Sequence, residues 1–292
     1  MGDVGAATAG DAISRILLFL DIELREQLDA VRRDETDAVH QARIRVRRIR
    51  SVLAVYRRLF DRDRTEDLRQ GLRELGVALG AARDPEVRAK STEDLLQART
   101  APAVIDAVEA MAAELLSDLG EARSDLLRLF ETEEHADLLN TFTRFAAAPP
   151  LHQRAGGPAR RTFRKALRRE VGRVDEKARA AADLRLAALH ELRKKARRLR
   201  YAADAVSSEP IGILGARTRR LAKAAETAQE VLGDHRDGIL LAQHLRHTLA
   251  GHTLGRSAAT GVGIFAARCE KQAYRELGRL DVALDGIREL YA

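Results

Sequence analysis

Apolar residues recur every three or four positions along almost the whole chain, and no segment sustains an alternation of apolar and polar residues. A spacing near 3.6 residues is typical of amphipathic helices, whereas period two is typical of half-buried strands. In the first half, the pattern predicts helices at residues 11–32, 37–60, 65–79, 85–98, 102–130 and 133–147. In the second half, it predicts helices at 158–181, 184–206, 211–232, 238–250 and 258–291. We therefore expect an all-α fold.

A cluster of helix breakers divides the chain near its middle. Residues 146–159 contain Pro149, Pro150, Gly156, Gly157 and Pro158, a composition typical of a linker. The expected organisation is a flexible N-terminus at 1–10, a first helical bundle at 11–148, a linker at 149–158 and a second helical bundle at 159–292.

Two segments of the chain repeat each other. Residues 39–50 are V-H-Q-A-R-I-R-V-R-R-I-R, and residues 189–200 are L-H-E-L-R-K-K-A-R-R-L-R. At an offset of 150, the first histidine and four of the arginines coincide. A second pair follows, with L-G-A-A-R-D at 79–84 and L-G-D-H-R-D at 232–237. An internal repeat of this kind indicates two copies of one structural unit.

The repeated segment forms a basic stripe when it is placed on a helix. His40, Arg43, Arg47 and Arg50 fall within one arc of roughly 80°, and Arg58 returns to the same arc two turns later. Residues 40–58 contain no acidic side chain, and like charges three or four positions apart cost a few tenths of a kcal/mol per pair. An anionic ligand would offset this repulsion. The alternative is that the arginines pair with acidic residues of neighbouring helices, and the histidines can equally well be structural.

The glycines of the second motif predict helix ends. Gly80 and Gly233 suit a left-handed cap at a helix C-terminus, and Asp84 before Pro85 suits the start of the next helix. We expect Arg83 and Arg236 to project toward the same ligand as the stripe, and Arg164 and Arg168 to extend the basic track from an adjacent helix.

Composition and charge support an anionic partner. The net charge is +7 and the isoelectric point is about 9.9. Residues 1–150 contain 22 Lys and Arg against 28 Asp and Glu, whereas residues 151–292 contain 29 against 16, so the excess positive charge lies in the second half. Arginine predominates over lysine, and its planar fork matches two phosphate oxygens.

Several functional classes receive little support from the sequence. The single cysteine, Cys269, excludes an internal disulfide and a cysteine-based zinc finger. His244, His247 and His252 lack the carboxylates of a convincing metal site, and no phosphate-binding loop or nucleophile elbow is present. The N-terminal residues lack the basic start of a signal peptide, and Ile13–Leu20 is too short for a membrane span. We therefore expect a cytoplasmic protein that uses no metal or cofactor.

The paired motifs resemble those of the CHAD family, the conserved histidine α-helical domain, over about residues 11–290. The resemblance implies two four-helix-type bundles related by a pseudo-two-fold axis, with a basic central groove or pore that binds inorganic polyphosphate. Transferred to this sequence, the polyphosphate-binding residues are His40, Arg43, Arg47, Arg48, Arg50, His190, Arg193, Lys194, Arg197, Arg198 and Arg200. Asp204 replaces the Ala54 of the first copy, so contacts at that end of the second stripe depart from the pattern.

The resemblance favours a binding protein over an enzyme, because many relatives carry an attached triphosphatase-like domain for which this chain has no room. Association with polyphosphate granules is one expected location. Two other functions stay open at this point: a nucleic-acid-binding protein that uses the same stripes, and a metal-dependent phosphohydrolase. Scarce aromatic residues, 4% of the chain, disfavour base stacking, so we expect nucleic acid to compete only weakly. A protein partner could contact the acidic first half.

Overall fold

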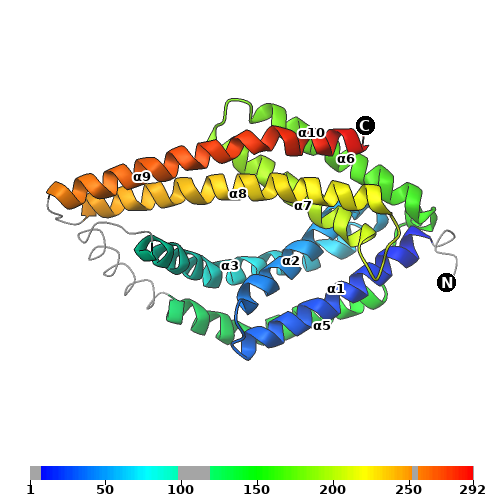
Figure 1. The fold of residues 1–292 in the computed structure, drawn as a ribbon. Coiled ribbons are helices and arrows are strands. Elements are labelled where there is room, and N and C mark those ends of the chain that lie inside the picture. The colour runs from blue at the N-terminus through cyan, green and yellow to red at the C-terminus, as the bar shows by residue number, and fades with distance from the viewer. Residues whose placement is uncertain (1–7, 98–118, 252–255, 292) are drawn as a thin grey trace.

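The computed structural model describes residues 8–97, 119–251 and 256–291, and these residues are helical almost throughout (Figure 1). The first half contains α1 (Ala9–Arg32), α2 (Ala38–Val55), the short 3-10 helix η1 (Arg57–Leu59), α3 (Asp63–Gln97), a helical segment at 119–130 and α5 (Glu133–Ala147). The connection contains η2 (Gln153–Gly156). The second half contains α6 (Ala159–Ala180), α7 (Leu186–Ser207), α8 (Ala216–Gly251), α9 (Arg256–Glu276), η3 (Leu277–Arg279) and α10 (Leu280–Tyr291). The expectation of an all-α fold is confirmed.

The helix starts follow from local capping. Thr8 and Asp11 form a capping box at the start of α1, in which the Asp11 backbone N–H donates to the Thr8 hydroxyl at 3.1 Å and the Thr8 N–H donates to the Asp11 carboxylate at 3.2 Å. Thr132 caps α5 through a 3.2 Å hydrogen bond from the His135 N–H. The first helix thus begins at Ala9, two residues before the expected position.

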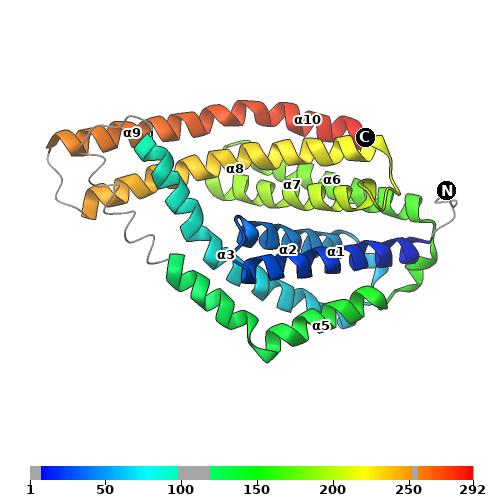
Figure 2. The ribbon, with the colours of Figure 1, turned by 60° about the horizontal axis from the view of Figure 1, so that its bottom comes forward.

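The helices α2 and α7 lie in the middle of the molecule (Figure 2). Helix α2 packs against α1, α3 and α7, and α7 packs against α6, α8 and α2. One continuous cluster of buried apolar side chains extends from Ala9 to Ile287 and includes residues of both halves. The core therefore holds α2 and α7 against each other, which fixes the relative position of the two repeated motifs.

The connection between the halves is attached to the first half. The His152 N–H donates to the Leu59 carbonyl at 2.8 Å, and Phe60 and Leu151 form an isolated antiparallel bridge. The Ala9 N–H donates to the Gly157 carbonyl at 2.8 Å, which ties the start of α1 to the same segment.

Several expected helix boundaries are wrong. Helix α3 continues through Gly80 to Gln97, and α8 continues through Gly233 to Gly251, so neither glycine ends a helix and Asp84 does not start one. Helix α2 ends at Val55, which moves Arg58 from the basic stripe to η1. The helix expected at 258–291 is divided by η3 into α9 and α10. The structural repeat of the two halves and the pseudo-two-fold axis that relates them stay predictions.

Candidate anion-binding site

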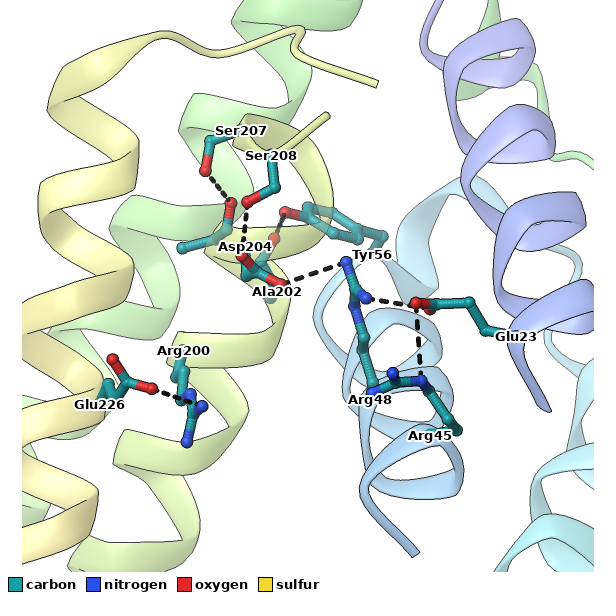
Figure 3. Close-up of polar contacts among 11 residues, drawn as sticks. Glu23, Arg45, Arg48, Tyr56, Arg200, Ala202, Asp204, Ser207, Ser208 and Glu226 are labelled. Carbon is teal, nitrogen blue, oxygen red and sulfur yellow. Dashed lines mark hydrogen bonds and ion pairs between the residues drawn. The ribbon is translucent and has the colours of Figure 1, made fainter. Parts of the chain in front are cut away.

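The two repeated helices come together at their buried sides. The Tyr56 hydroxyl, just beyond the end of α2, donates to the Ala202 carbonyl of α7 at 2.7 Å. Arg48 of α2 reaches Asp204 of α7, with 3.1 Å between its Nη2 and the carboxylate. Figure 3 shows these contacts between the two helices, beside Glu23 of α1. They hold the α2 and α7 backbones side by side.

Four arginines of the two motifs form one cluster, which we call the central arginine cluster: Arg43, Arg47, Arg193 and Arg197. Burial, followed by the charges of Arg197 and Arg43, lowers the pKa of Arg47 to about 9. Burial also lowers the pKa of Arg197 to about 10, together with the charges of Arg193 and Arg43. The stripes of α2 and α7 therefore lie close enough for their charges to repel each other.

Three members of the central arginine cluster have no direct acidic partner among the described residues. Among the described residues, no hydrogen bond or ion pair joins Arg47, Arg193 or Arg197 to a carboxylate. The Nε of Arg193 is buried without a hydrogen-bond partner in this part of the chain. Burial lowers the pKa of Arg193; the charge of Asp237 acts in the opposite direction, and the charges of Arg236 and Arg43 lower the pKa further. Half-buried guanidiniums with unused donors are suited to bind an anion.

The glycines of the second motif make room for this cluster. A Cβ on Gly80 would lie 3.5 Å from the Arg43 guanidinium, and a Cβ on Gly233 would lie 3.1 Å from Nη2 of Arg193. The two glycines thus let an arginine of α2 rest on α3 and the matching arginine of α7 rest on α8. Their role is close packing rather than helix termination, which explains why the predicted caps are wrong.

The two histidines occupy matching positions beside a second arginine. His40 is half-buried, and its pKa is lowered by burial and then by the charge of Arg83. His190 is exposed, and its pKa is lowered by burial, then by Lys194 and Arg236. The expected proximity of Arg83 and Arg236 to the stripes is supported, although Arg83 also forms a 3.7 Å ion pair with Asp37.

Four of the eleven residues expected to bind the ligand already have carboxylate partners. Arg48 pairs with Glu23 at 3.0 Å and with Asp204, and Arg200 pairs with Glu226 at 2.5 Å (Figure 3). Arg198 pairs with Glu170, whose side chain is fully buried, and Lys194 pairs with Glu191. The alternative that neighbouring helices neutralise the stripe thus holds for Arg48, Arg198 and Arg200.

Arg50 faces another basic group that the sequence pattern did not indicate. Its pKa is lowered by burial, then by the charges of Arg73 and Arg69 on α3. Arg69 pairs with Glu66, whereas Arg73 is exposed near Arg50. Arg73 does not belong to either motif, so only the packing of α3 against α2 identifies it.

A cavity of about 270 Å³ lies between α7 and α8, next to Arg193 of the central arginine cluster. His190, Arg193, His235 and Arg236 are among its lining residues, together with leucines and Ile239. A larger cavity of about 580 Å³ between α8 and α9 is lined by two acids, Asp234 and Glu276, and by two arginines, Arg268 and Arg279.

Other expected elements lie away from the central cluster. Arg58 is close to Arg169 of α6, and Arg164 and Arg168 are close enough to Tyr291 of α10 to affect its pKa. The described residues contain no group of three or more His, Cys, Asp or Glu side chains that could hold a metal ion, and His252 lies outside them. Within the same residues, no helix has the length and apolar character required to cross a membrane.

Comparisons with known proteins agree on one family. The family model of the CHAD domain matches residues 22–246. Two uncharacterized proteins of Mycobacterium tuberculosis, Rv2226 from strain H37Rv and MT2285 from strain CDC 1551, are each 30% identical over 277 residues, which cover 89% of this chain and 51% of theirs. The chain therefore spans about half the length of these curated relatives.

Two solved structures have the same fold. PptA from Streptomyces chartreusis superposes with a TM-score of 0.74 at 19% identity, covering 98% of this chain and 99% of its own. The CHAD domain from the plant Ricinus communis superposes with a TM-score of 0.70 at 21% identity, covering 98% of this chain and 92% of its own. The likeness of these two structures concerns the fold.

Proposed function

The chain belongs to the CHAD domain family, and on this premise we propose that it binds inorganic polyphosphate at the central arginine cluster without chemical turnover. The observation that carries the proposal is the cluster itself. Half-buried arginines of α2 and α7 lie beside one another, and Arg47, Arg193 and Arg197 form no ion pair in the described chain. The family is associated with polyphosphate-related proteins, which fits this ligand.

Polyphosphate suits the cluster for a chemical reason. Each phosphate unit carries about one negative charge, and a guanidinium can donate two parallel hydrogen bonds to phosphate oxygens. A chain of phosphates would place a negative charge near each of several arginines and so remove the repulsion among them. Polyphosphate has no bases. Tyr201, the aromatic residue that affects the pKa of Arg47 and Arg197, is buried and so offers little ring surface on which a base could stack.

The ion-paired arginines have a supporting role in this proposal. Arg48 joins α1, α2 and α7 through Glu23 and Asp204, and Arg198 joins α7 to α6 through Glu170. These pairs hold the backbones that present the central arginine cluster. We further propose that the protein acts in the cytoplasm, where polyphosphate granules are one location, and that its acidic first half is available to a protein partner.

The proposal is tested by calorimetric titration of the wild-type protein with long-chain polyphosphate at several salt concentrations, followed by competition with duplex DNA. We expect tight binding that weakens steeply with salt, by roughly 10³ to 10⁵ between 50 and 200 mM for six to ten phosphate contacts. Preferential binding of DNA would favour the nucleic-acid alternative, and release of orthophosphate in the presence of a divalent metal would favour the phosphohydrolase.

Polyphosphate affinity is expected to rise as the pH falls. The pKa values of His40 and His190 are lowered in the free protein, so both imidazoles are largely neutral near pH 7. A bound polyanion favours the charged imidazolium and raises both pKa values, so binding takes up protons. Titrations from about pH 8 to about pH 6 should show a gain of roughly tenfold. The His40→Gln, His190→Gln double variant should lose this gain, and the exposed His247→Gln variant should keep it. A flat wild-type profile would exclude the histidines from the site.

The Gly233→Ala variant is expected to bind polyphosphate more weakly without losing stability. Alanine in a helix interior is favoured over glycine by roughly 0.5–1 kcal/mol, but the new Cβ would displace the flexible end of Arg193. Affinity should fall by up to about tenfold, the equivalent of one charged hydrogen bond. The matched control is Gly263→Ala on α9, where a Cβ meets no atom within 4 Å. Equal affinities for the two variants would mean that Arg193 does not contact the ligand.

A further inference from the structure

We propose that a second basic surface, formed by Arg57, Arg58, Arg154 and Arg169, contacts the same polyphosphate chain as the central arginine cluster, so that long chains engage both. This inference rests on the proposed function. We call this surface the α6 face, and it continues along α6 through Arg173 and Lys177.

Three segments that are distant in the sequence form the α6 face. Arg57 and Arg58 belong to η1, Arg154 belongs to η2, and Arg169 belongs to α6. The His152 N–H bonded to the Leu59 carbonyl joins η2 to η1. The rings of Tyr56 and Phe163 pack edge to face with 5.0 Å between centroids, which joins the end of α2 to α6. The backbone therefore fixes these arginines as neighbours.

The four arginines that form the α6 face lack carboxylate partners, whereas Arg173 and Lys177, along which it continues, pair with Glu170 and Glu176. Arg57, Arg58 and Arg154 are exposed, and in the described parts of the chain none of these three, nor Arg169, forms an ion pair with a carboxylate. The pKa of Arg169 is lowered by burial and then by the charges of Arg58, Arg173, Arg57 and Arg154, with no acidic group acting in the opposite direction. Like charges assembled in this way favour an anionic partner.

The fold itself does not require this basic surface. Along α6, Arg169, Arg173 and Lys177 follow each other at intervals of four residues, which places them on one side of the helix. At the offset of 150 residues, the equivalent positions of α1 are Phe19, Glu23 and Gln27. Since α1 packs against α2 as α6 packs against α7 without such residues, the stripe on α6 is an addition to the repeated unit.

The α6 face and the central arginine cluster lie on different sides of α7. Arg193 rests against Gly233 of α8, whereas Arg198 pairs with Glu170 of α6. Burial and then the charge of Arg198 lower the pKa of Lys195; Glu170 acts in the opposite direction, and Arg173 and Lys177 lower it further, so Lys195 lies beside the basic residues on the α6 side of α7. A ligand confined to the central cluster would not reach the α6 face, but a long flexible chain can pass from one to the other.

Polyphosphate is the favoured occupant because one flexible polymer can serve both surfaces. Once one part of the chain is bound, the second contact becomes intramolecular and raises the overall affinity without a new ligand. Duplex DNA is stiff over this range, with a persistence length of about 150 base pairs, and would contact the α6 face alone.

The experiment compares two triple variants that change the net charge equally. The test variant carries Arg58→Gln, Arg154→Gln and Arg169→Gln. The control carries Arg33→Gln, Arg128→Gln and Arg279→Gln. These three arginines are exposed, lie outside the α6 face, and each pairs with a carboxylate two or three residues away. Both are titrated with long-chain polyphosphate, with tripolyphosphate and with duplex DNA at several salt concentrations, after circular dichroism has verified the helical content of each.

The test variant should lose at least about tenfold in affinity for the long chain, and the slope of its salt dependence should fall by about two units. Its affinity for tripolyphosphate should equal that of the control. Unchanged affinity for the long chain would overturn the inference, as would equal losses for both chain lengths or a loss confined to DNA. If the wild-type protein binds neither polyphosphate, the proposed function fails and this inference fails with it.

Discussion

Replacing Arg47 and Arg197 together with methionine is expected to reduce polyphosphate affinity by roughly 10² to 10⁴-fold while leaving the protein at least as stable. The loss corresponds to about 3–6 kcal/mol, from one or more charged hydrogen bonds at each arginine. These two arginines are the most strongly perturbed members of the central arginine cluster, with pKa values of about 9 and about 10. They lie on opposite helices, so both stripes lose a contact.

The effect on stability has the opposite sign to that of most buried substitutions. Because the folded-state pKa lies below the ordinary value, the charged guanidinium lowers the free energy of unfolding at neutral pH. This loss of stability begins to be recovered only as the pH rises through the folded-state pKa values of about 9 and about 10. Methionine retains much of the apolar stem and removes the charge, and such replacements are often neutral or stabilising. The wild-type protein should gain stability from polyphosphate, because the ligand binds only the folded state.

The measurements are calorimetric titration and thermal unfolding, each with and without long-chain polyphosphate. Arg33→Met, Arg128→Met is the control pair, since both arginines are exposed and paired with nearby acids. A variant that binds as well as the control would remove the central arginine cluster from the site. A large fall in melting temperature would show that Arg47 and Arg197 stabilise the fold and are not reserved for a ligand.

Replacing Glu170 with methionine is expected to destabilise the protein by about 3–5 kcal/mol, the usual cost of removing one partner of a buried ion pair. The Glu170 side chain is fully buried and accepts from both Arg198 and Arg173. Methionine has nearly the same length but leaves both guanidiniums without their acceptor. For a chain of this size, the melting temperature should fall by roughly 10 °C.

Denaturant unfolding measures this loss of stability. Glu176→Gln on the same helix is the control, because the Glu176 side chain is 65% exposed and forms an ion pair only with Lys177 in the described chain. Polyphosphate binding by the folded Glu170→Met protein should stay within a few-fold of wild type at low temperature. If stability is unchanged, Arg198 does not depend on Glu170, and its position as a ligand for phosphate regains support. Loss of binding without loss of stability would lead to the same conclusion.

The sequence alone determined the class of fold and the identity of the two central helices. The helical period of the apolar residues is a local property, so α1, α5, α6 and α7 were predicted to within two residues, and so was the start of α2. The repeated His and Arg motif also carried the resemblance to the CHAD family, which the family match at residues 22–246 confirms. Local patterns were less informative where a glycine had two possible roles. Gly80 and Gly233 suggested helix ends, whereas both lie within long helices beside an arginine.

Only the tertiary structure decided which arginines are available to a ligand. Arg47 and Arg48 are adjacent in the sequence, but successive helix positions differ by about 100° in direction, so their side chains meet different neighbours. Arg47 lies in the central arginine cluster, whereas Arg48 lies between Glu23 and Asp204. The acids that neutralise part of the stripes come from α1, α6, α7 and α8. Glu23, Glu170 and Glu226 lie outside the repeated motif, so the motif alone does not identify them as partners. Charge compensation depends on which helices pack together. The motif therefore identifies the candidate arginines, and the packing separates those with a carboxylate partner from those without one.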